Sequence, residues 1–381
     1  MNSPSLVIDR RLASSPSGAP ASGNGARNPE GQEAAPAKRQ RPADHELGFG
    51  RVFTDNLFLA DWTTQKGWHA ARVAPYSALP FDPAAAVLHY GQALFEGFKI
   101  FRGVDNVLRA FRVDRHAARM ASGAARLCMP AIDPEVFKAG MQALLDVDGS
   151  WVPSSPGTAL YVRPTLVATE GFLGVRPAES YVFFHIFSPV GPYYAEGMGP
   201  VKIWIEQNYT RAAAGGLGAV KTGANYAASL LAASEAKKKG YTQVLWTDAK
   251  EHRWLEEVGT MNLFVQIGDE IITPPLGGSI LAGVTRASVL EVLADYKLRA
   301  VERPVSVEEL VEAHGKGTLK EVFGTGTAAV ISPVGELGYG DKKLVVGDGQ
   351  TGPLARRLYD DLTSMQYAQK PDRFGWLTKV G

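Results

Sequence analysis

A single lysine stands between two groups of glycines at residues 215–226, which read GGLGAVKTGANY. Glycine lets the backbone approach a ligand closely, and the small neighbours leave Lys221 as the one amine in the stretch. A helix is expected over residues 227–240, because alanines and leucines dominate, lysines fill its last turn and Gly240 follows. The chain is therefore expected to fold so that one amine reaches into a ligand-sized space beside a helix.

Lys221 has three interpretations at this point. A phosphate loop of the GxxxxGK[ST] type would need glycine at position 220, where the sequence has Val220. A lysine whose surroundings lower its pKa can instead condense with a carbonyl to form a Schiff base. The third interpretation is an ordinary surface lysine in a loop. The choice among the three depends on the other segments of the sequence.

Length and charge narrow the classes of protein. A chain of 381 residues suggests two domains. A net charge of +1 gives no basic field, so nucleic acid is not an expected partner. No apolar run approaches the length of a membrane span, so no membrane partner is expected either. The single cysteine, Cys128, indicates a reducing, cytoplasmic location, and we expect Cys128 itself to be a small core residue.

The composition changes along the chain and predicts its division. Residues 1–45 are rich in Ser, Ala, Pro, Gly and Arg with few large apolar groups, which predicts a disordered tail. A small α/β domain is expected over residues 46–192, a loop between the domains over 193–200, and a larger domain over 201–381.

The second half alternates strand and helix patterns, which predicts an α/β (α+β) fold. A hairpin is expected around Gly268 and Asp269. Further helices are expected over residues 114–129, 134–147, 285–296, 307–313 and 354–367.

Three short segments could build a site for an anionic ligand. Glu257, in WLEEVGTMNLF, stands at the entry of an apolar strand, where a carboxylate can be buried if it meets a cation such as a protonated pyridine nitrogen. Residues 283–285 begin a helix, so their free N–H groups and the helix dipole favour an anion, although an ordinary Thr N-cap would look the same. GTGTAA at residues 324–329 has the GxGxxA spacing of a dinucleotide site, but Pro333 interrupts the helix that such a site needs. A turn that exposes N–H groups to a carboxylate explains it better.

Taken together, six segments closely resemble the branched-chain amino-acid aminotransferases, which are fold-type-IV pyridoxal-phosphate enzymes. The segments are YGQALFEGFKIFRG, YVRP, GGLGAVKTGANY, EEVGTMNLF, LAGVTR and GTGTAAVISPV. The similarity runs from about residue 49 to the C-terminus, with the motifs in the family's order and at family-like spacings. The resemblance implies a two-domain fold with pyridoxal 5'-phosphate between the domains, a homodimer with residues crossing between subunits, and no metal.

The resemblance also assigns residues to the cofactor. Lys221 matches the lysine that forms the Schiff base with pyridoxal phosphate, and Tyr226 matches the tyrosine that bonds to the phenolic oxygen of the cofactor. Glu257 matches the carboxylate that keeps the pyridine nitrogen protonated. The other matching cofactor contacts are Arg119, Arg211, Val284, Thr285 and Thr327.

On the substrate side, the resemblance implies an apolar wall with two polar recognition points. Thr260 and the backbone at Ala328 match the donors to the α-carboxylate. Arg163 matches the arginine that meets the second carboxylate of glutamate or 2-oxoglutarate. The wall residues that match are Tyr90, Phe95, Tyr161, Val175 and Tyr193.

The implied reaction is reversible transamination of leucine, isoleucine or valine with 2-oxoglutarate. D-amino-acid aminotransferase and aminodeoxychorismate lyase share the fold, and the aromatic pocket together with Arg163 argues against both. The set of Lys221, Tyr226 and Glu257 argues against a non-catalytic binding protein. One departure from the mammalian members is that Ala329 and Ser332 occupy the positions of their redox CxxC pair.

Overall fold

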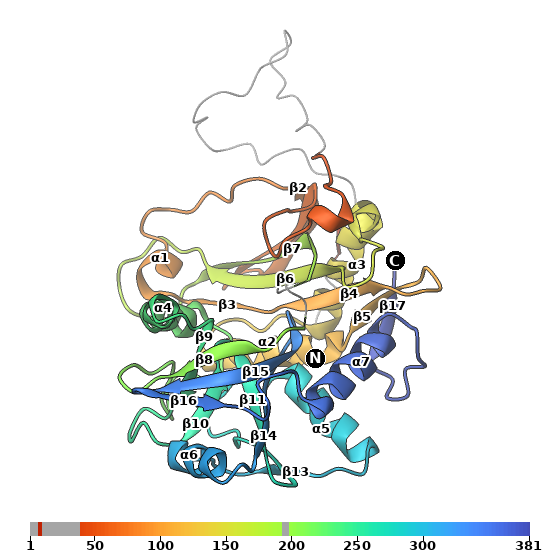
Figure 1. Cartoon of the computed structure of the whole chain (residues 1–381). Helices are drawn as coiled ribbons and strands as arrows, with labels where there is room; N and C mark the ends of the chain where they lie inside the picture. Colours follow the sequence, from red (N-terminus) through yellow and green to blue (C-terminus); the bar gives the residue numbers. More distant parts are fainter. Residues whose placement is uncertain (1–6, 10–38, 193–197) are drawn as a thin grey trace.

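The computed structural model describes residues 7–9, 39–192 and 198–381. These residues form two sheets, which lie one above the other in Figure 1, with helices packed around them. The expected α/β architecture with two domains is confirmed. Among the helices of the described residues, none is both long and apolar enough to cross a membrane.

The first sheet is antiparallel and, within the described residues, has the strand order β17-β5-β4-β6-β7-β1-β2, with β3 pairing with β6. Its strands are β1 (Asn56–Thr63), β2 (Gly67–Pro75), β3 (Ala93–Phe95), β4 (Phe98–Arg102), β5 (Leu108–Phe111), β6 (Ala159–Ala168), β7 (Ser180–Val190) and β17 (Leu377–Val380). The helices of this domain are η1 (Asp44–Glu46), α1 (Ala86–Tyr90), α2 (Val113–Arg126), α3 (Pro134–Asp148) and η2 (Gly149–Trp151).

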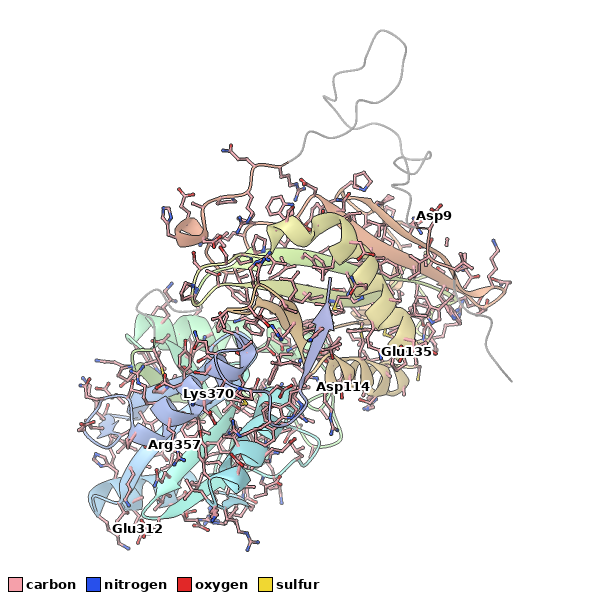
Figure 2. All side chains as sticks on the ribbon, turned by 90° about the vertical axis from the view of Figure 1, so that its right-hand side faces the viewer. Asp9, Asp114, Glu135, Glu312, Arg357 and Lys370 are labelled. Atoms are coloured by element: carbon pink, nitrogen blue, oxygen red, sulfur yellow. The ribbon has the colours of Figure 1, made fainter. Side chains whose placement is uncertain are left out.

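One face of the first sheet packs on α2 and α3, whose first turns carry Asp114 and Glu135 in Figure 2. Side chains alternate along a strand, so β4 sends Phe98 to this core and the next residue, Lys99, to the opposite face. That opposite face meets the second domain, and it is where the candidate site lies.

The second sheet has the strand order β10-β9-β8-β15-β14-β11-β12-β13, with β16 beside β15. β10 also pairs with β11, so six of the strands close into a small barrel. The strands are β8 (Val201–Ile205), β9 (Gln243–Thr247), β10 (Leu255–Val258), β11 (Met261–Ile267), β12 (Glu270–Thr273), β13 (Ala300–Glu302), β14 (Leu319–Gly326), β15 (Val330–Tyr339) and β16 (Lys342–Val345). The helices are α4 (Gly223–Lys238), α5 (Val284–Asp295), α6 (Val307–Gly315) and α7 (Pro353–Gln366).

The last strand returns to the first domain, which differs from the expected division at residue 201. Leu377 of β17 pairs with Phe111 of β5, beside the α7 helix in Figure 1. A hydrophobic cluster joins the domains at this point, with Phe101 and Phe111 from the first and Phe264 and Leu358 from the second. The loop expected over residues 193–200 lies mostly outside the described residues.

Part of the expected tail contacts the first domain. The Asp9 N–H donates to the Ala71 carbonyl (2.9 Å), at the edge strand β2. Asp44 accepts hydrogen bonds from the N–H groups of Ser154 (2.9 Å) and Ser155 (2.8 Å). Residues 7–9 and 39–45 therefore belong to the folded molecule, which differs from the prediction of a disordered tail; residues 1–6 and 10–38 lie outside the described part.

The prediction that Cys128 is a core residue is wrong, because its side chain is exposed. α2 ends at Arg126, and Cys128 then adopts a left-handed conformation with φ of 52°. The turn buries Met129 and leaves the thiol outside.

Candidate active site

The glycine-rich loop brings Lys221 to the junction of the two domains. Its backbone docks on β3, because Phe95 N–H donates to the Lys221 carbonyl (3.0 Å) and the Thr222 hydroxyl donates to the Ala93 carbonyl (2.7 Å). Gly218 is required at its position, since a Cβ there would lie 2.2 Å from the carbonyl oxygen of Ser279. The amine of Lys221 donates to the Tyr226 hydroxyl at 2.7 Å.

Burial changes the acid–base properties of both groups. Burial, and after it the positive charge of Arg119, lowers the pKa of Lys221 to about 8. Burial also raises the pKa of Tyr226 to about 12, so the phenol keeps its proton at neutral pH. Lys221 thus has a sizeable neutral fraction near neutral pH, as a nucleophilic or basic amine requires.

Glu257 is a buried carboxylate held from several sides. It accepts hydrogen bonds from Leu281 N–H (2.9 Å) and the Asn262 side chain (3.2 Å). The Nε of Arg211 lies 3.0 Å from its Oε2. Burial raises the pKa of Glu257, and Arg211 opposes that rise. Glu257, Arg211 and Tyr226 line a small recess next to the cavity of Lys221.

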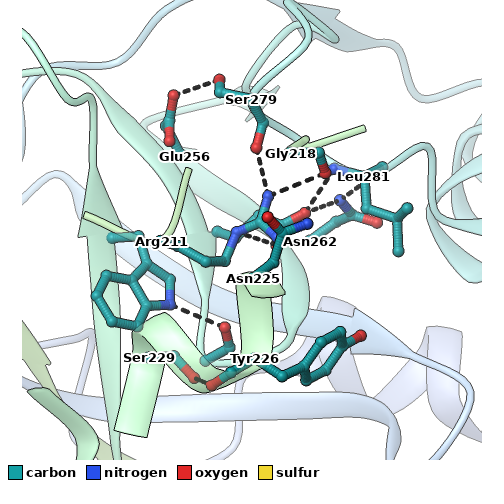
Figure 3. A network of polar contacts seen from close by, with 12 residues as sticks. Arg211, Gly218, Asn225, Tyr226, Ser229, Glu256, Asn262, Ser279 and Leu281 are labelled. Atoms are coloured by element: carbon teal, nitrogen blue, oxygen red, sulfur yellow. Dashed lines mark hydrogen bonds and ion pairs between the residues drawn. The ribbon is translucent and has the colours of Figure 1, made fainter. Parts of the chain in front are cut away.

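Arg211 contacts Glu257 and the backbone of the loop. Figure 3 shows its guanidinium reaching the carbonyls of Gly218 and Ser279, while the Ser279 hydroxyl contacts Glu256. The adjacent glutamates therefore differ in surroundings: Glu257 faces the recess and Glu256 bonds to Ser279. Arg211 holds Glu257 in place from the side of the loop.

Arg119 enters the cavity from α2, where a buried glutamate fixes it. Its Nε donates to Glu96 Oε1 (2.6 Å) and its NH2 group to Glu96 Oε2 (2.8 Å), while NH1 donates to the Ala282 carbonyl (2.9 Å). His116 Nδ1 lies 2.8 Å from the same Glu96 Oε2. Burial alone would raise the pKa of Glu96, but Arg119 and His116 together hold that pKa well below its usual range.

The N-terminus of α5 forms the other side of the cavity near Arg119. Gly283 is its N-cap, and Val284 and Thr285 follow. Free N–H groups and the helix dipole favour an anion at this end. The hydroxyl of Thr325 also lines the cavity and, among the described residues, has no hydrogen-bond partner. Glu257 and this anion site therefore line two adjacent cavities, which share Tyr226, Thr260 and Leu281.

Most of the sequence-predicted residues come together here. The cavity is lined by Phe95, Arg119, Tyr161, Arg163, Lys221, Tyr226, Thr260, Val284, Thr285, Thr327 and Ala328. The guanidinium of Arg163 lies 4.7 Å from the centre of the Phe95 ring and donates to the Tyr161 hydroxyl (3.0 Å).

Three predicted wall residues are not placed in this cavity. The Tyr90 side chain is 42% exposed and Val175 is 87% exposed, and neither lines the cavity of its own chain. The Tyr90 hydroxyl contacts the Leu173 carbonyl, so Tyr90 and the loop before Val175 lie together on the surface. Tyr193 lies outside the described residues.

Sequence reasoning missed several residues of the site. Phe49 packs edge-on against Tyr161, with ring centres 5.1 Å apart, and lines the cavity. Glu96 and Asn262 hold Arg119 and Glu257. Glu96 offered one signal, a carboxylate inside the apolar run ALFEGFKIF. Asn262 and Phe49 offered none.

Comparisons with known proteins show the family of this chain. The family described as amino-transferase class IV matches residues 93–337. Branched-chain-amino-acid aminotransferase 2 of Bacillus subtilis (strain 168) is 47% identical over 348 residues, which cover 91% of this chain and 96% of that protein. The crystal structure of the Escherichia coli branched-chain amino acid aminotransferase aligns with a TM-score of 0.71 at 25% identity, over 84% of this chain and 99% of that one. The Thermobaculum terrenum branched-chain amino acid aminotransferase, solved in its PLP-form, has the same fold, with a TM-score of 0.70 at 22% identity over 86% of this chain and 100% of that one.

Proposed function

This chain belongs to the class IV aminotransferases, and from that membership we propose that it exchanges the amino group of leucine, isoleucine or valine with 2-oxoglutarate, using pyridoxal 5'-phosphate. The observation that carries the proposal is the Lys221 amine, 2.7 Å from the Tyr226 hydroxyl and with its pKa lowered to about 8. An anion site lines the same cavity, and the buried carboxylate of Glu257 lines the adjacent recess.

The residues present suit this cofactor. Its aldehyde and phenolic oxygen are neighbours on the ring, as the Lys221 amine and the Tyr226 hydroxyl are neighbours here. Glu257 would meet the ring nitrogen, and the α5 N-terminus, Arg119 and the unpartnered hydroxyl of Thr325 would meet the phosphate. When bound, the cofactor supplies an electron sink for the charge left at the substrate Cα.

Lys221 performs the proton transfer. Its Nζ takes the proton from the substrate Cα and later returns it, which requires a pKa near the working pH. Tyr226 keeps its own proton because burial raises its pKa, so its hydroxyl can donate a hydrogen bond next to Lys221 throughout. Arg211 keeps Glu257 oriented, since it bonds to the loop as well as to the carboxylate.

The cavity can hold both an apolar side chain and a second carboxylate. Phe49, Phe95 and Tyr161 give an aromatic wall for leucine. Arg163 stacks on that wall and lines the cavity, so its guanidinium can pair with a distal carboxylate. The Thr260 side chain and the backbone at Ala328 are the donors for the α-carboxylate.

A homodimer accounts for the exposed wall residues. Tyr90 and Val175 lie on the surface of their own chain, so a second copy could receive them at its cavity. The single cysteine of the chain supports a reducing, cytoplasmic location.

Lys221→Ala tests the function directly. The variant is expected to bind pyridoxal phosphate without the visible band of a Schiff base and to lose leucine–2-oxoglutarate transamination by several orders of magnitude. Lys66→Ala, at an exposed turn, is the matched control and should keep both. A Lys221→Ala protein that retains the band and the turnover would refute the assignment.

A further inference from the structure

A second cavity, of about 530 Å³, lies between the domains and shares a single lining residue, Ala328, with the Lys221 cavity. We call it the interdomain cavity. The first domain contributes β4 and the turn that follows it, and the second contributes the start of β15 and one side of α7. Its volume is in the range of small-molecule sites, which occur preferentially between domains. Nothing in the proposed reaction uses it.

The lining of the interdomain cavity is positively charged. Lys99 and Arg102 line it, and no aspartate or glutamate does among the residues described. Lys99 is 7% exposed, and its Nζ makes one hydrogen bond, to the Ala328 carbonyl at 2.7 Å. Arg102 donates to the Asn106 side chain (2.8 Å) and the Val152 carbonyl (3.2 Å). Within the described ranges, neither cation has a carboxylate partner.

A buried cation of this kind is costly without an anion. An ammonium group has three donors, and Lys99 uses one of them on a neutral carbonyl. Burial lowers the pKa of Lys99 to about 8, with no carboxylate to oppose the change. An anionic ligand would supply the missing charge and use the remaining donors.

The rest of the lining is largely apolar. Phe101, Val330 and Ile331 form part of the wall beside Lys99, and Val104 lies at the exposed rim. A hydrated inorganic ion would leave this apolar surface uncovered. An organic acid with a short hydrocarbon chain would cover it and bring its charge to the cation.

We propose that the interdomain cavity is a second ligand site, which takes a small carboxylate with an apolar body, its charge on Lys99 and its carbon chain along Phe101 and Ile331. This site goes beyond the proposed function. Because Lys99 also holds the carbonyl of Ala328, an occupant acts on the turn that lines the Lys221 cavity from the other side.

The test separates the two cavities. The holoenzyme is treated with leucine and borohydride, so that a phosphopyridoxyl-leucine adduct fills the Lys221 cavity. The ligand is 4-methylpentanoate, which has neither an amino nor an oxo group. With the Lys221 cavity filled, titration calorimetry measures its binding outside that cavity. Wild-type protein should bind one molecule per chain. Lys99→Met should bind it about ten-fold more weakly or worse, as for a lost charge-assisted hydrogen bond, while Lys99→Arg stays within about three-fold.

Two further variants test the site in case Lys99→Met loses binding because it misfolds. Thr363→Phe places a ring in the interdomain cavity from α7 and should abolish binding, whereas Lys66→Met on the surface should leave it unchanged. No heat from the filled wild-type protein, or equal binding by Lys99→Met, would overturn the second site. If the adduct does not form, the proposed function is at fault, and the same variants are then compared in the untreated protein.

Discussion

Burial determines the chemistry of Lys221. A lysine in water is almost wholly protonated at neutral pH, whereas this one has a pKa lowered to about 8, first by burial and then by the charge of Arg119. Only the neutral amine attacks a carbonyl. The pH dependence of that attack therefore reports the environment of one residue.

The rate at which the apoprotein condenses with pyridoxal should rise with pH through a midpoint near 8 and level off above it. Pyridoxal is chosen because it lacks the phosphate that Arg119 would bind. The wild type and the Arg119→Gln variant can therefore be compared without a difference in phosphate binding. That variant should shift the midpoint upward, since a cation that lowers the pKa has been removed. Stopped-flow absorbance measures the rate, and a midpoint near that of a free lysine would contradict the expected burial effect.

Glu96 is the residue at which a single substitution should cost most stability in the site. It is fully buried, and both of its oxygens accept hydrogen bonds from Arg119, while His116 Nδ1 also lies against Oε2. Glu96→Gln leaves the Arg119 charge without its anion, which is expected to lower the free energy of unfolding by about 3 kcal/mol. Denaturant unfolding measures it.

The matched control for Glu96 is Glu312→Gln, which breaks an exposed pair with Lys316 and should leave the stability close to that of the wild type. Inorganic phosphate offers Arg119 another anion. It should therefore raise the melting temperature of Glu96→Gln more than that of the wild type. An equal shift in both proteins would mean that Arg119 does not meet phosphate.

The residues that sequence reasoning predicted and those it missed differ in kind. Lys221, Tyr226 and Glu257 stand in recognisable segments, and the structure brings them together. Glu96 and Asn262 act through partners that fold next to them, and no local pattern indicates such a pairing. Tyr90 and Val175 matched the family by position, but their own chain leaves them outside the cavity.

The secondary-structure elements follow their local patterns closely. The helix expected over 134–147 is Pro134–Asp148, and the one expected over 354–367 is Pro353–Gln366. The hairpin at Gly268 and Asp269 is confirmed as β11 and β12. α4 begins earlier than expected, at Gly223, because the Asn225 side chain donates to two carbonyls of the lysine loop and ties the loop to the first turn.

Amino-acid composition predicted a disordered tail that extends too far, to residue 45. An average composition does not reveal the few residues of the segment that have specific partners in the fold. Asp44 is such a residue, as two N–H groups of the 154–155 turn donate to it. Asp44→Ala should lower the free energy of unfolding by about 2 kcal/mol, as for hydrogen bonds to a charged group. A protein starting at residue 46 should lose at least as much, whereas one starting at residue 39 keeps the hydrogen bonds of Asp44. Equal melting temperatures for all of these proteins would show that the segment contributes nothing.

At the scale of the whole molecule, the C-terminal segment connects the two domains by packing between them. Trp376, just before β17, is 6% exposed and stacks on Phe374 (4.1 Å between ring centres) and edge-on against Phe111 (5.8 Å). The guanidinium of Arg112, at the start of α2, lies 4.8 Å from its ring. No sequence pattern indicated that the last strand would cross back, since its partner β5 lies more than half the chain away.

Trp376→Ala should therefore destabilise the protein by about 3–5 kcal/mol, the cost of emptying a large buried aromatic site. Phe172→Ala, at a ring that is 42% exposed, is the control and should change stability by less than about 1 kcal/mol. Thermal unfolding of both variants decides the matter. A small effect of Trp376→Ala would mean that the rest of the cluster holds the domains without it.

The chain leaves the first sheet after β7 and re-enters it at β17, so the second domain is an insertion within the first. An inserted domain is joined to its host by two chain connections, so it cannot reorient freely about a single linker. Two chain crossings join it to the first domain, one after β7 and the other between α7 and β17. The Lys221 cavity and the interdomain cavity are both lined by residues of the two domains. A ligand held in either cavity would contact both domains and therefore oppose their separation.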